Sequence, residues 1–599
     1  MPRKSAQPDA PALFVKKKQA QPASVEGTIK SIQQIMWQDV GVSGDAQRIE
    51  QLVWMIFLKI FDDKEREYEL NRKYKSPLPE ELRWRNWAGD ENKGLTGDDL
   101  LKFVNNELFE KLKTIDFAAG DPRGLIVGVV FRDAYNYMKS GTLLRQVINK
   151  INEINFNNTK DRHDFNDIYE TILRDLQAAG NAGEYYTPRP VTRFIVERIK
   201  PRPGERVLDV ACGTGGFLAG ALDFMKDKIK SIDARRALQD NIIGYEKKPL
   251  PHLLCTTNMM LHGVEVPRGI HRDNLLTKPF IGFSNRDRVD VITTNPPFGG
   301  IEEDSVTSNF PTAFKTKETA DLFLLLMSHL LKPGGRGAVV LPDGSLFGEG
   351  GVKTRIKEKF LQECNLHTIV RLPNGVFSPY TSIKTNLLFF TKGEPTGEIW
   401  FYEQPLPEGR KNYTKTAPIK DEDFAGCIEW WDNRTENKQA WQYDFRSIYE
   451  KAIAEATPFW EAGREAEERA KIHERDARET IEDGRRLEAS LRIGGISRAE
   501  QKRVRKQLLE LDMQRTEHLR LEKEAREAAR EAKARGDAIY DPVYNLDIKN
   551  PNGANDFEHM TPQALADDIL EKERRIAEIM MEIKDALTKT EYDLQEAGV

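Results

Sequence analysis

Two patterns of hydrophobic and polar residues divide this chain into helical flanks and a central region of mixed structure. Over residues 25–177, apolar side chains recur at spacings of three and four, which is the period of one face of an α-helix. Between about residues 205 and 392, short β-branched runs alternate with stretches of helical period. This alternation predicts one mostly parallel, doubly wound sheet, so we expect an α/β fold within residues 178–400.

The N-terminal flank is predicted to be a helical domain over residues 25–177. Residues 1–24 are rich in Pro, Ala, Gln and Lys and are expected to form a disordered tail. A further helix is predicted over residues 161–176. The flank contains no catalytic constellation, so we interpret it as a packing or docking domain. Two of its predicted helical faces consist of Ile49, Leu52, Val53, Ile56, Phe57 and Ile60, and of Leu101, Val104, Leu108 and Leu112.

The C-terminal third is strongly charged. An irregular connection rich in Trp, Tyr and Pro is expected over residues 401–447. Residues 448–537 are dominated by Glu, Arg, Lys and Ala, and they predict two long helices folded back as an antiparallel hairpin. Residues 538–599 predict a loop and a last helix that packs on the hairpin or on a partner subunit. The apolar stripe of that helix is Leu565, Ile569, Ile576, Ile579 and Ile583.

Composition narrows the class of protein. Of the 599 residues, 39% are hydrophobic and 31% are charged, which favours long solvated helices beside an ordinary core. The net charge of -5 argues against a general polyanion binder. Four scattered cysteines argue against a disulfide framework and a zinc site, and no apolar run is long enough to span a membrane. We therefore expect a cytoplasmic protein.

A short motif follows the predicted strand over residues 289–294. Asn295, Pro296, Pro297 and Phe298 stand where the strand ends, and ligands of open α/β sheets bind just past the carboxyl ends of strands. The Asn295 side chain and the Pro296 carbonyl offer two acceptors, and Phe298 offers a ring face. This combination suits an exocyclic amino group on a planar ring. The alternative is an ordinary turn, with Asn as a cap and Phe in the core.

A second motif lies upstream, where residues 206–217 predict a strand, a glycine-rich turn and a helix. Glycines permit positive φ and a close approach of ligand to backbone. The G-x-G-G spacing differs from that of dinucleotide-binding loops and no P-loop lysine follows, so a phosphate cradle is disfavoured. Because Asp209 precedes the loop, the motif suits a ligand with a cationic amino group and a ribose.

Further candidate residues flank the loop. Glu246 ends the next predicted strand, a position suited to binding ribose hydroxyls, although a surface carboxylate is the alternative. Asp273 is a weaker candidate for the same pocket. Thr187 and Pro188 predict a helix start, with Thr187 as N-cap and Pro188 as the first helical residue.

Together, the loop motif of residues 209–217 and the motif of residues 295–298 resemble motifs I and IV of amino-methylating DNA methyltransferases that use S-adenosylmethionine. The order Tyr-Tyr-Thr-Pro, glycine loop, Asn-Pro-Pro-Phe resembles the gamma group of adenine-N6 enzymes. The helical N-terminal domain and residues 544–552 (Tyr-Asn-Leu-Asp-Ile-Lys-Asn-Pro-Asn) narrow the resemblance to the modification subunit of type I restriction-modification systems. It covers residues 25–447 and 540–599. Two departures are Val210, where the family has proline, and a longer charged hairpin.

The resemblance implies a role for each matching residue. Asn295 and the Pro296 carbonyl would accept both N6 hydrogens of an adenine flipped out of the duplex, with Pro297 completing the motif. Phe298 would stack on that base and Phe377 would cover its other face. No metal is required. The residues implied in cofactor binding are Glu184, Tyr185, Tyr186, Thr187, Pro188 and Arg189 as a cover, Asp209, Thr214, Gly215 and Gly216 at the amino-acid end, Glu246 at the ribose and Asp273 at the adenine ring.

The resemblance also implies partners. A specificity subunit would read the DNA sequence, two copies of this chain would bind it, and a motor-nuclease restriction subunit would join for cleavage. Three other functions stay open: methylation of a protein glutamine, stand-alone methylation in another phage-defence system, and a helical scaffold with an inactive methyltransferase domain. Transfer to cytosine N4 is a further alternative, although Asn at position 295 favours adenine.

Overall fold

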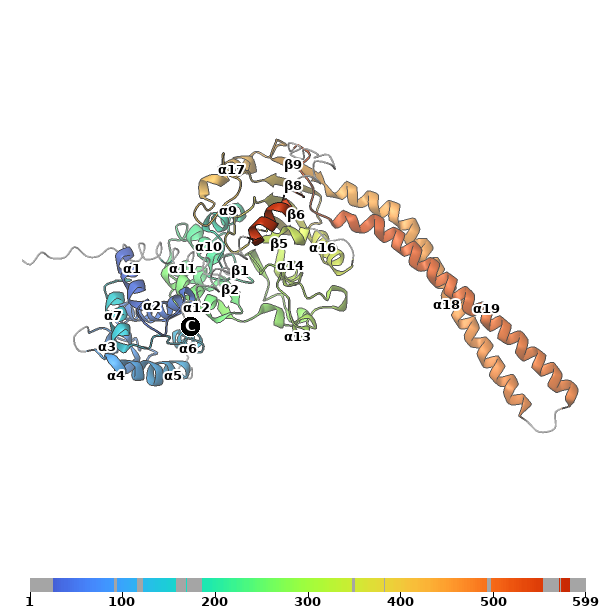
Figure 1. The fold of residues 1–599 in the computed structure, drawn as a ribbon, viewed down its shortest axis with the longest axis horizontal. Coiled ribbons are helices and arrows are strands. Elements are labelled where there is room, and N and C mark those ends of the chain that lie inside the picture. Colours follow the sequence, from blue (N-terminus) through green and yellow to red (C-terminus); the bar gives the residue numbers. More distant parts are fainter. Residues whose placement is uncertain are drawn as a thin grey trace, which may run out of the picture.

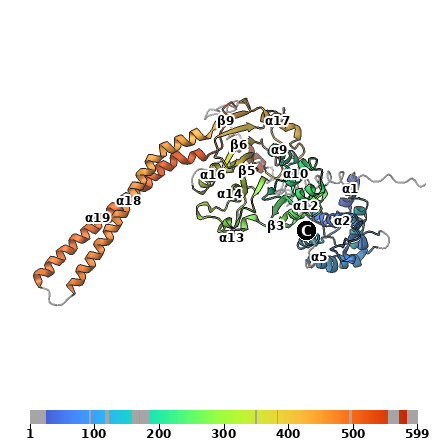
Figure 2. The same ribbon diagram turned by 180° about the vertical axis from the view of Figure 1, so that it is seen from behind.

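The protein consists of a helical lobe, an α/β body and a long helical hairpin that projects away from the body (Figures 1 and 2). The mixed α/β class predicted from the sequence is confirmed, with helices before and after the sheet. None of the described helices combines the length and apolar character needed to cross a lipid bilayer. The computed structural model describes residues 25–90, 94–115, 122–157, 169, 186–346, 351–381, 383–492, 497–552, 570 and 572–581.

The N-terminal lobe is built around α2, which is buried on almost every side. The predicted apolar face of this helix is in the core, and so are Trp54 and Met55, which do not belong to that face. The same core includes Leu253 and Leu254 of α12 (Pro249–Leu261), so the lobe packs directly onto the α/β body. The helix predicted over residues 161–176 lies outside the described residues, apart from the buried Tyr169. The helices of the lobe are α1 (Val25–Met36), α2 (Asp45–Tyr68), α3 (Trp84–Trp87), α4 (Gly97–Lys102), α5 (Phe109–Lys113), α6 (Pro122–Phe131) and α7 (Gly141–Asn152).

The body contains one nine-stranded sheet of order β3-β2-β1-β4-β5-β7-β6-β8-β9. Strands β3, β2, β1, β4 and β5 are mutually parallel, and β7 runs antiparallel between β5 and β6. The strand order reverses between β1 and β4, which creates a crevice at their carboxyl ends. The strands are β1 (Val207–Asp209), β2 (Ile242–Glu246), β3 (Ile270–Arg272), β4 (Val289–Thr294), β5 (Leu331–Pro342), β6 (Cys364–Arg371), β7 (Thr385–Lys392), β8 (Glu398–Glu403) and β9 (Ala440–Asp444).

Helices cover both faces of the sheet. Neighbouring strand residues point to opposite faces, so Val207 and Val291 belong to one core, whereas Leu208 and Ile292 belong to the other. The first core is closed by α9 (Arg189–Ile199), α10 (Gly216–Lys226), α11 (Ile232–Asp240), α12 (Pro249–Leu261) and α17 (Ala425–Asp432). The second is closed by α14 (Thr319–Leu330) and α16 (Gly351–Glu363), and the short helices α13 (Asp304–Thr307) and α15 (Asp343–Leu346) lie in neighbouring loops.

The prediction of an irregular connection over residues 401–447 is wrong. The stretch contains the end of β8, helix α17 and strand β9, which extend the sheet beyond β6. Its aromatic residues are core residues: Trp441 stacks on Phe401 with ring centroids 5.1 Å apart. Because these elements are short and separated by polar loops, they give no sustained period in the sequence.

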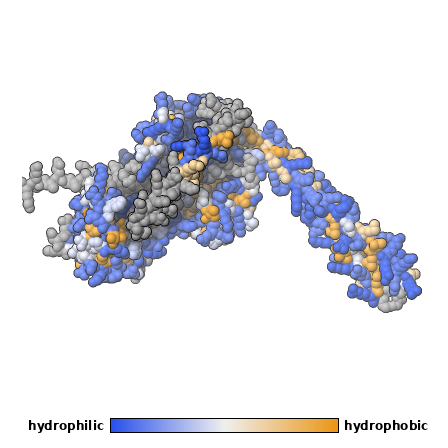
Figure 3. Space-filling model, in the orientation of Figure 1, coloured by the Kyte–Doolittle hydropathy of each residue, from blue (hydrophilic) through white to orange (hydrophobic). Residues whose placement is uncertain are grey.

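Two long helices, α18 (Phe445–Leu491) and α19 (Arg498–Tyr540), lie side by side along most of their length (Figure 1). Their surface is largely hydrophilic (Figure 3). After α19 the chain returns to the body, where the buried Lys357 donates hydrogen bonds to the carbonyls of Tyr544 (3.1 Å) and Leu346 (2.7 Å). Residues 572–581 are helical and exposed, so they do not pack on the hairpin.

Candidate active site

A cavity of about 310 Å³ lies at the carboxyl ends of β1, β2 and β4. Predicted residues from four parts of the chain line this cavity, and together they span more than a hundred positions of the sequence. Glu184 and Tyr185 lie outside the described residues. The predicted residues that line the cavity are Thr187, Asp209, Thr214, Gly216, Glu246, Asn295 and Pro297.

The glycine loop forms one wall because its backbone adopts conformations that other residues avoid. Gly213 and Gly215 have φ of 53° and 81°, and α10 begins directly afterwards at Gly216. A Cβ at Gly215 would lie 2.8 Å from the Cys255 sulfur. The buried Asn258 of α12 donates a hydrogen bond to the Thr214 carbonyl at 2.9 Å. Sequence reasoning missed Asn258, since nothing in the helix distinguishes it from a core polar residue.

We expect Gly215→Ala to lower the free energy of unfolding by about 1–3 kcal/mol, the usual cost of placing a side chain in the left-handed region. Cofactor affinity should fall as well, because the loop must shift away from Cys255. Gly220→Ala is the matched control, since a Cβ at this position of α10 would make an ordinary 3.5 Å contact with Val196 of α9. Urea unfolding of both variants checks this, and equal stabilities would contradict it.

Two buried carboxylates face the cavity. Asp209 is 1% exposed and accepts a hydrogen bond from the Thr294 hydroxyl at 2.6 Å. Burial raises the pKa of Asp209 to about 7, and the negative charge of Glu246 adds to this. Glu246 accepts the backbone N–H groups of Gly213 (3.0 Å) and Lys248 (2.8 Å), one on each oxygen. Burial also raises the pKa of Glu246 above its ordinary value.

Asn295 is held by a contact that the sequence did not predict. Its Nδ2 donates a hydrogen bond to the Thr187 hydroxyl at 3.0 Å. Its Oδ1 is buried, and no residue in the described part of the chain donates a hydrogen bond to it. The prediction of Thr187 as N-cap is wrong, because Pro188 occupies the cap position of α9 without a side-chain cap. Thr187 instead fixes the Asn295 amide, which leaves Oδ1 as an acceptor at the cavity.

The aromatic residues are arranged differently from the prediction. Phe298 is half-buried, and its ring meets Phe377 edge to face with centroids 5.8 Å apart. Phe377 is 2% exposed, so it supports Phe298 from below and does not present a second stacking face. Which of the two rings is accessible could not be predicted from the sequence, because that depends on how the loop after β6 folds over β4.

Asp273 is an exposed residue outside the cavity lining, which gives no support to its predicted contact with the cofactor ring. Its backbone N–H donates to the Glu246 carbonyl at 3.0 Å, so it ties β3 to β2. Glu302 lines the cavity instead and is 7% exposed. Glu302 accepts hydrogen bonds from Asn274 (3.2 Å) and Thr319 (3.4 Å). It was missed because it lies in a polar stretch that predicted only a loop over the site.

The remaining predicted cover residues lie behind the glycine loop. Tyr186 is buried, and the Arg189 guanidinium lies 5.8 Å from its ring centroid. A Cβ at Gly216 would lie 2.4 Å from Arg189 Nη1, so the guanidinium packs against the start of α10. Tyr186, Pro188 and Arg189 therefore stand next to the loop without lining the cavity.

Two family models match this chain, one over its N-terminal lobe and one over its α/β body. The family model for N-6 DNA methylase matches residues 160–468, and the model for the HsdM N-terminal domain matches residues 25–151. The EcoEI type I restriction enzyme methylase subunit of Escherichia coli is 59% identical over 435 residues, covering 71% of this chain and 88% of the relative. The EcoKI methylase subunit of Escherichia coli K12 is 31% identical over 401 residues, covering 62% of this chain and 70% of the relative.

Solved structures agree with the sequence relatives. A modification subunit of a putative type I restriction enzyme from Vibrio vulnificus YJ016 is 44% identical, with a TM-score of 0.65, covering 72% of this chain and 94% of that one. A chain from a structure on complex assembly and conformational transition of the type I R-M system is 32% identical, with a TM-score of 0.67. This match covers 95% of the chain described here and 99% of the other.

Proposed function

Since this chain belongs to the N-6 DNA methylase family, as the methylase subunit of a type I restriction-modification system, we propose that its cavity transfers a methyl group from S-adenosylmethionine to adenine N6 in double-stranded DNA. One observation carries this proposal: the glycine loop, two buried carboxylates and the free Asn295 acceptor meet in one cavity. Both family models and both relatives favour DNA over a protein glutamine as the methyl acceptor.

The residues of the cavity fit S-adenosylmethionine. Asp209 offers a carboxylate for a cationic amino group, and the glycine loop leaves room for an amino-acid moiety close to the backbone. Each Glu246 oxygen accepts one backbone N–H and retains a lone pair for a ribose hydroxyl. When bound, the cofactor supplies a methyl group on a positively charged sulfur. The protein contributes placement, which is worth several kcal/mol in reactions that need little acid-base chemistry.

The target base would be held by the motif after β4. An adenine inside a duplex is out of reach, so it must be flipped into the site. Asn295 Oδ1 and the Pro296 carbonyl would accept the two N6 hydrogens, which turns the nitrogen lone pair out of the ring plane toward the methyl group. Phe298 would stack on the base for about 1–3 kcal/mol. Phe377 fixes the orientation of the Phe298 ring through its edge-to-face contact.

We expect cofactor affinity to rise with pH because of Asp209. Its pKa of about 7 means that the carboxyl is mostly protonated below pH 7 and ionised above it. A cationic amino group binds the ionised form better, so affinity should increase between about pH 6 and pH 8 and then level off, with proton release on binding. Calorimetry in two buffers of different ionisation enthalpy measures this. Asp209→Asn should flatten the pH dependence; an unchanged profile would contradict the assignment.

The partners proposed for this chain are DNA, a specificity subunit and a restriction subunit, with two copies of the chain per specificity subunit. The exposed helix at residues 572–581 supports a docking role, since Ile576, Ile579 and Met580 are 61%, 41% and 60% exposed. We also propose a cytoplasmic location, because all four cysteines are buried and free.

Methyl transfer to unmethylated DNA, measured with and without the co-expressed specificity subunit, tests the partner assignment. We expect transfer only in its presence, because sequence recognition resides in the partner. Ile576→Glu combined with Ile579→Glu should weaken co-purification of the two subunits while leaving cofactor binding unchanged. Robust, site-specific methylation by the chain alone would show that it reads its own site.

A further inference from the structure

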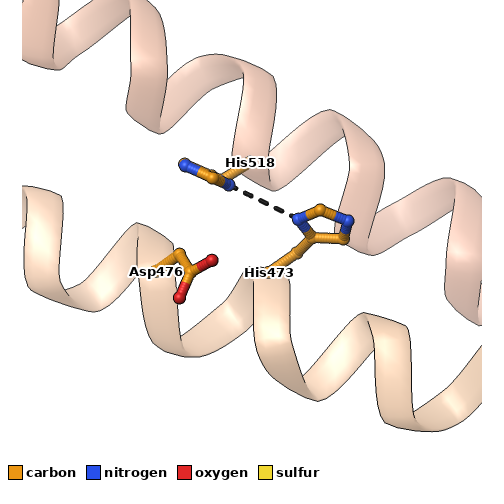
Figure 4. A group of neighbouring side chains, drawn as sticks. All are labelled: His473, Asp476 and His518. Carbon is orange, nitrogen blue, oxygen red and sulfur yellow. Dashed lines mark hydrogen bonds between the residues drawn. The ribbon is translucent and has the colours of Figure 1, made fainter.

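The hairpin holds a group of side chains that methyl transfer does not use. His473 and Asp476 come from α18 and His518 comes from α19 (Figure 4). One nitrogen or oxygen atom from each of the three lies within 4.8 Å of the other two, and all three residues are half-buried. The Nδ1 atoms of the two histidines face each other at 3.4 Å. The sequence did not predict this group, because the two histidines are 45 positions apart.

Both histidines stand in the contact seam, meaning the rows of residues through which α18 and α19 pack together. Seam residues recur every seven positions, the repeat of helices that pack along one another. A polar residue in such a seam costs stability unless its polar atoms have a partner. His473 falls in a row with Ala466 and Thr480, and His518 falls in a row with Val504, Leu511, Ala525 and Ala532.

The distance between the two facing imidazole nitrogens matches the distance between two nitrogen ligands of one metal ion. Two nitrogens bound to one tetrahedral Zn²⁺ at about 2.0–2.1 Å are about 3.3 Å apart by geometry. The observed Nδ1–Nδ1 distance of 3.4 Å needs almost no adjustment to accept the ion. A direct hydrogen bond satisfies the pair only when one facing nitrogen carries a hydrogen and the other does not. A divalent cation instead accepts a lone pair from each.

Of the carboxylates near the histidines, Glu517 pairs with Arg520 at 2.6 Å. Glu474 pairs with Arg478 and Arg526 on the flanks of the seam. Asp476 is the carboxylate that lies beside both histidines (Figure 4), and one of its oxygens also accepts a hydrogen bond from the Arg475 guanidinium at 3.1 Å. The second Asp476 oxygen is available to a metal ion without breaking that contact.

We propose that His473, Asp476 and His518 bind one Zn²⁺, or a divalent transition-metal ion of similar ligand preference, which cross-links α18 and α19. Two imidazoles and a carboxylate are common zinc ligands, whereas Mg²⁺ and Ca²⁺ select sites built from oxygen atoms. The fourth position is open to water. The ion would fix the two helices to each other well away from the methyl-transfer cavity and stiffen the projecting arm.

The test uses the full-length chain, stripped of metal with a chelator and titrated with Zn²⁺ by calorimetry. We expect one ion per chain at this site. His473→Ala and His518→Ala should each weaken zinc binding more than about tenfold, because even the loss of an outer-shell partner of a ligand costs about 10–100-fold. Co²⁺ as a probe should give the visible spectrum of a tetrahedral site, and that spectrum should disappear in both variants.

Two further variants distinguish zinc binding at this site from adventitious zinc binding elsewhere on the chain. Arg475→Ala should keep or tighten zinc binding, because it releases the Asp476 oxygen that the guanidinium holds. His262→Ala should leave it unchanged, since His262 contacts Asp223 outside the hairpin. Circular dichroism should show that all variants keep their helical content. Failure of the wild-type chain to bind Zn²⁺, or equal binding by the His473→Ala, His518→Ala double variant, would overturn the proposal.

Discussion

Replacing Asn295 with alanine is expected to lower the rate of methyl transfer by about 10²–10³-fold, the effect of removing one preorganised hydrogen-bonding group from an active site. The reason is geometric. Asn295 Oδ1 is a buried acceptor at the cavity that no described residue satisfies, and Thr187 fixes the amide that carries it. Without Oδ1, the amino group of the target base loses one of its two acceptors. Cofactor affinity, measured separately by calorimetry, should change little.

Thr187→Val provides the matched control for this variant. It keeps the shape of the side chain but removes the hydroxyl that accepts the hydrogen bond from Asn295 Nδ2 at 3.0 Å. Loss of one such bond is worth about 1 kcal/mol, so transfer should slow by roughly fivefold. An Asn295→Ala enzyme with a normal transfer rate would remove Asn295 from the chemistry. Equal losses in both variants would mean that Thr187 has a role of its own.

Replacing Glu246 with alanine is expected to weaken cofactor binding by about 10–100-fold, because hydrogen bonds to a charged group contribute about 1.5–3 kcal/mol. Two effects combine in this variant. The ribose hydroxyls lose their acceptor, and the Gly213 N–H that Glu246 holds at 3.0 Å is released, which loosens the loop. The apparent KM for the cofactor should rise, whereas kcat at saturating cofactor should recover in large part.

Asp273→Ala is the informative comparison for Glu246. Both are acids near the end of β2 and β3, and both were predicted to contact the cofactor. Asp273 is exposed and lies outside the cavity lining, so its removal should leave cofactor affinity unchanged. Isothermal titration of the two variants side by side decides between them. A large loss on Asp273→Ala, or none on Glu246→Ala, would exchange their assigned roles.

The parts of the fold with a sustained period or an unusual turn were predictable from sequence. Strand β4 occupies the predicted residues 289–294, and the strand, glycine turn and helix at residues 206–217 form as expected. These signals are local: β-branched runs favour strands, and the glycines are needed at positive φ. Strands β3, β8 and β9 were not predicted, because these short runs, unlike β1 and β4, are followed by no glycine-rich or Asn-Pro-Pro turn that marks them.

The composition of the site was partly predictable, whereas the pairings between its residues were not. Motif spacing placed Asp209, Glu246 and Asn295 at the ends of neighbouring strands. The Thr187–Asn295 hydrogen bond joins residues 108 positions apart, and Glu302 enters the cavity from a long loop. Such contacts arise from tertiary packing. The same holds for Phe377, whose burial beneath Phe298 depends on a loop that folds over the end of β4.

The most direct measurement is the transfer of tritiated methyl groups from S-adenosylmethionine to unmethylated DNA by the chain and its specificity subunit, followed by digestion to nucleosides. We expect the label in N6-methyladenine with the wild-type chain, and about 10²–10³-fold slower labelling with Asn295→Ala. Label in N4-methylcytosine would contradict the adenine assignment. Label in protein with none in DNA would contradict the role of this cavity in methylating DNA.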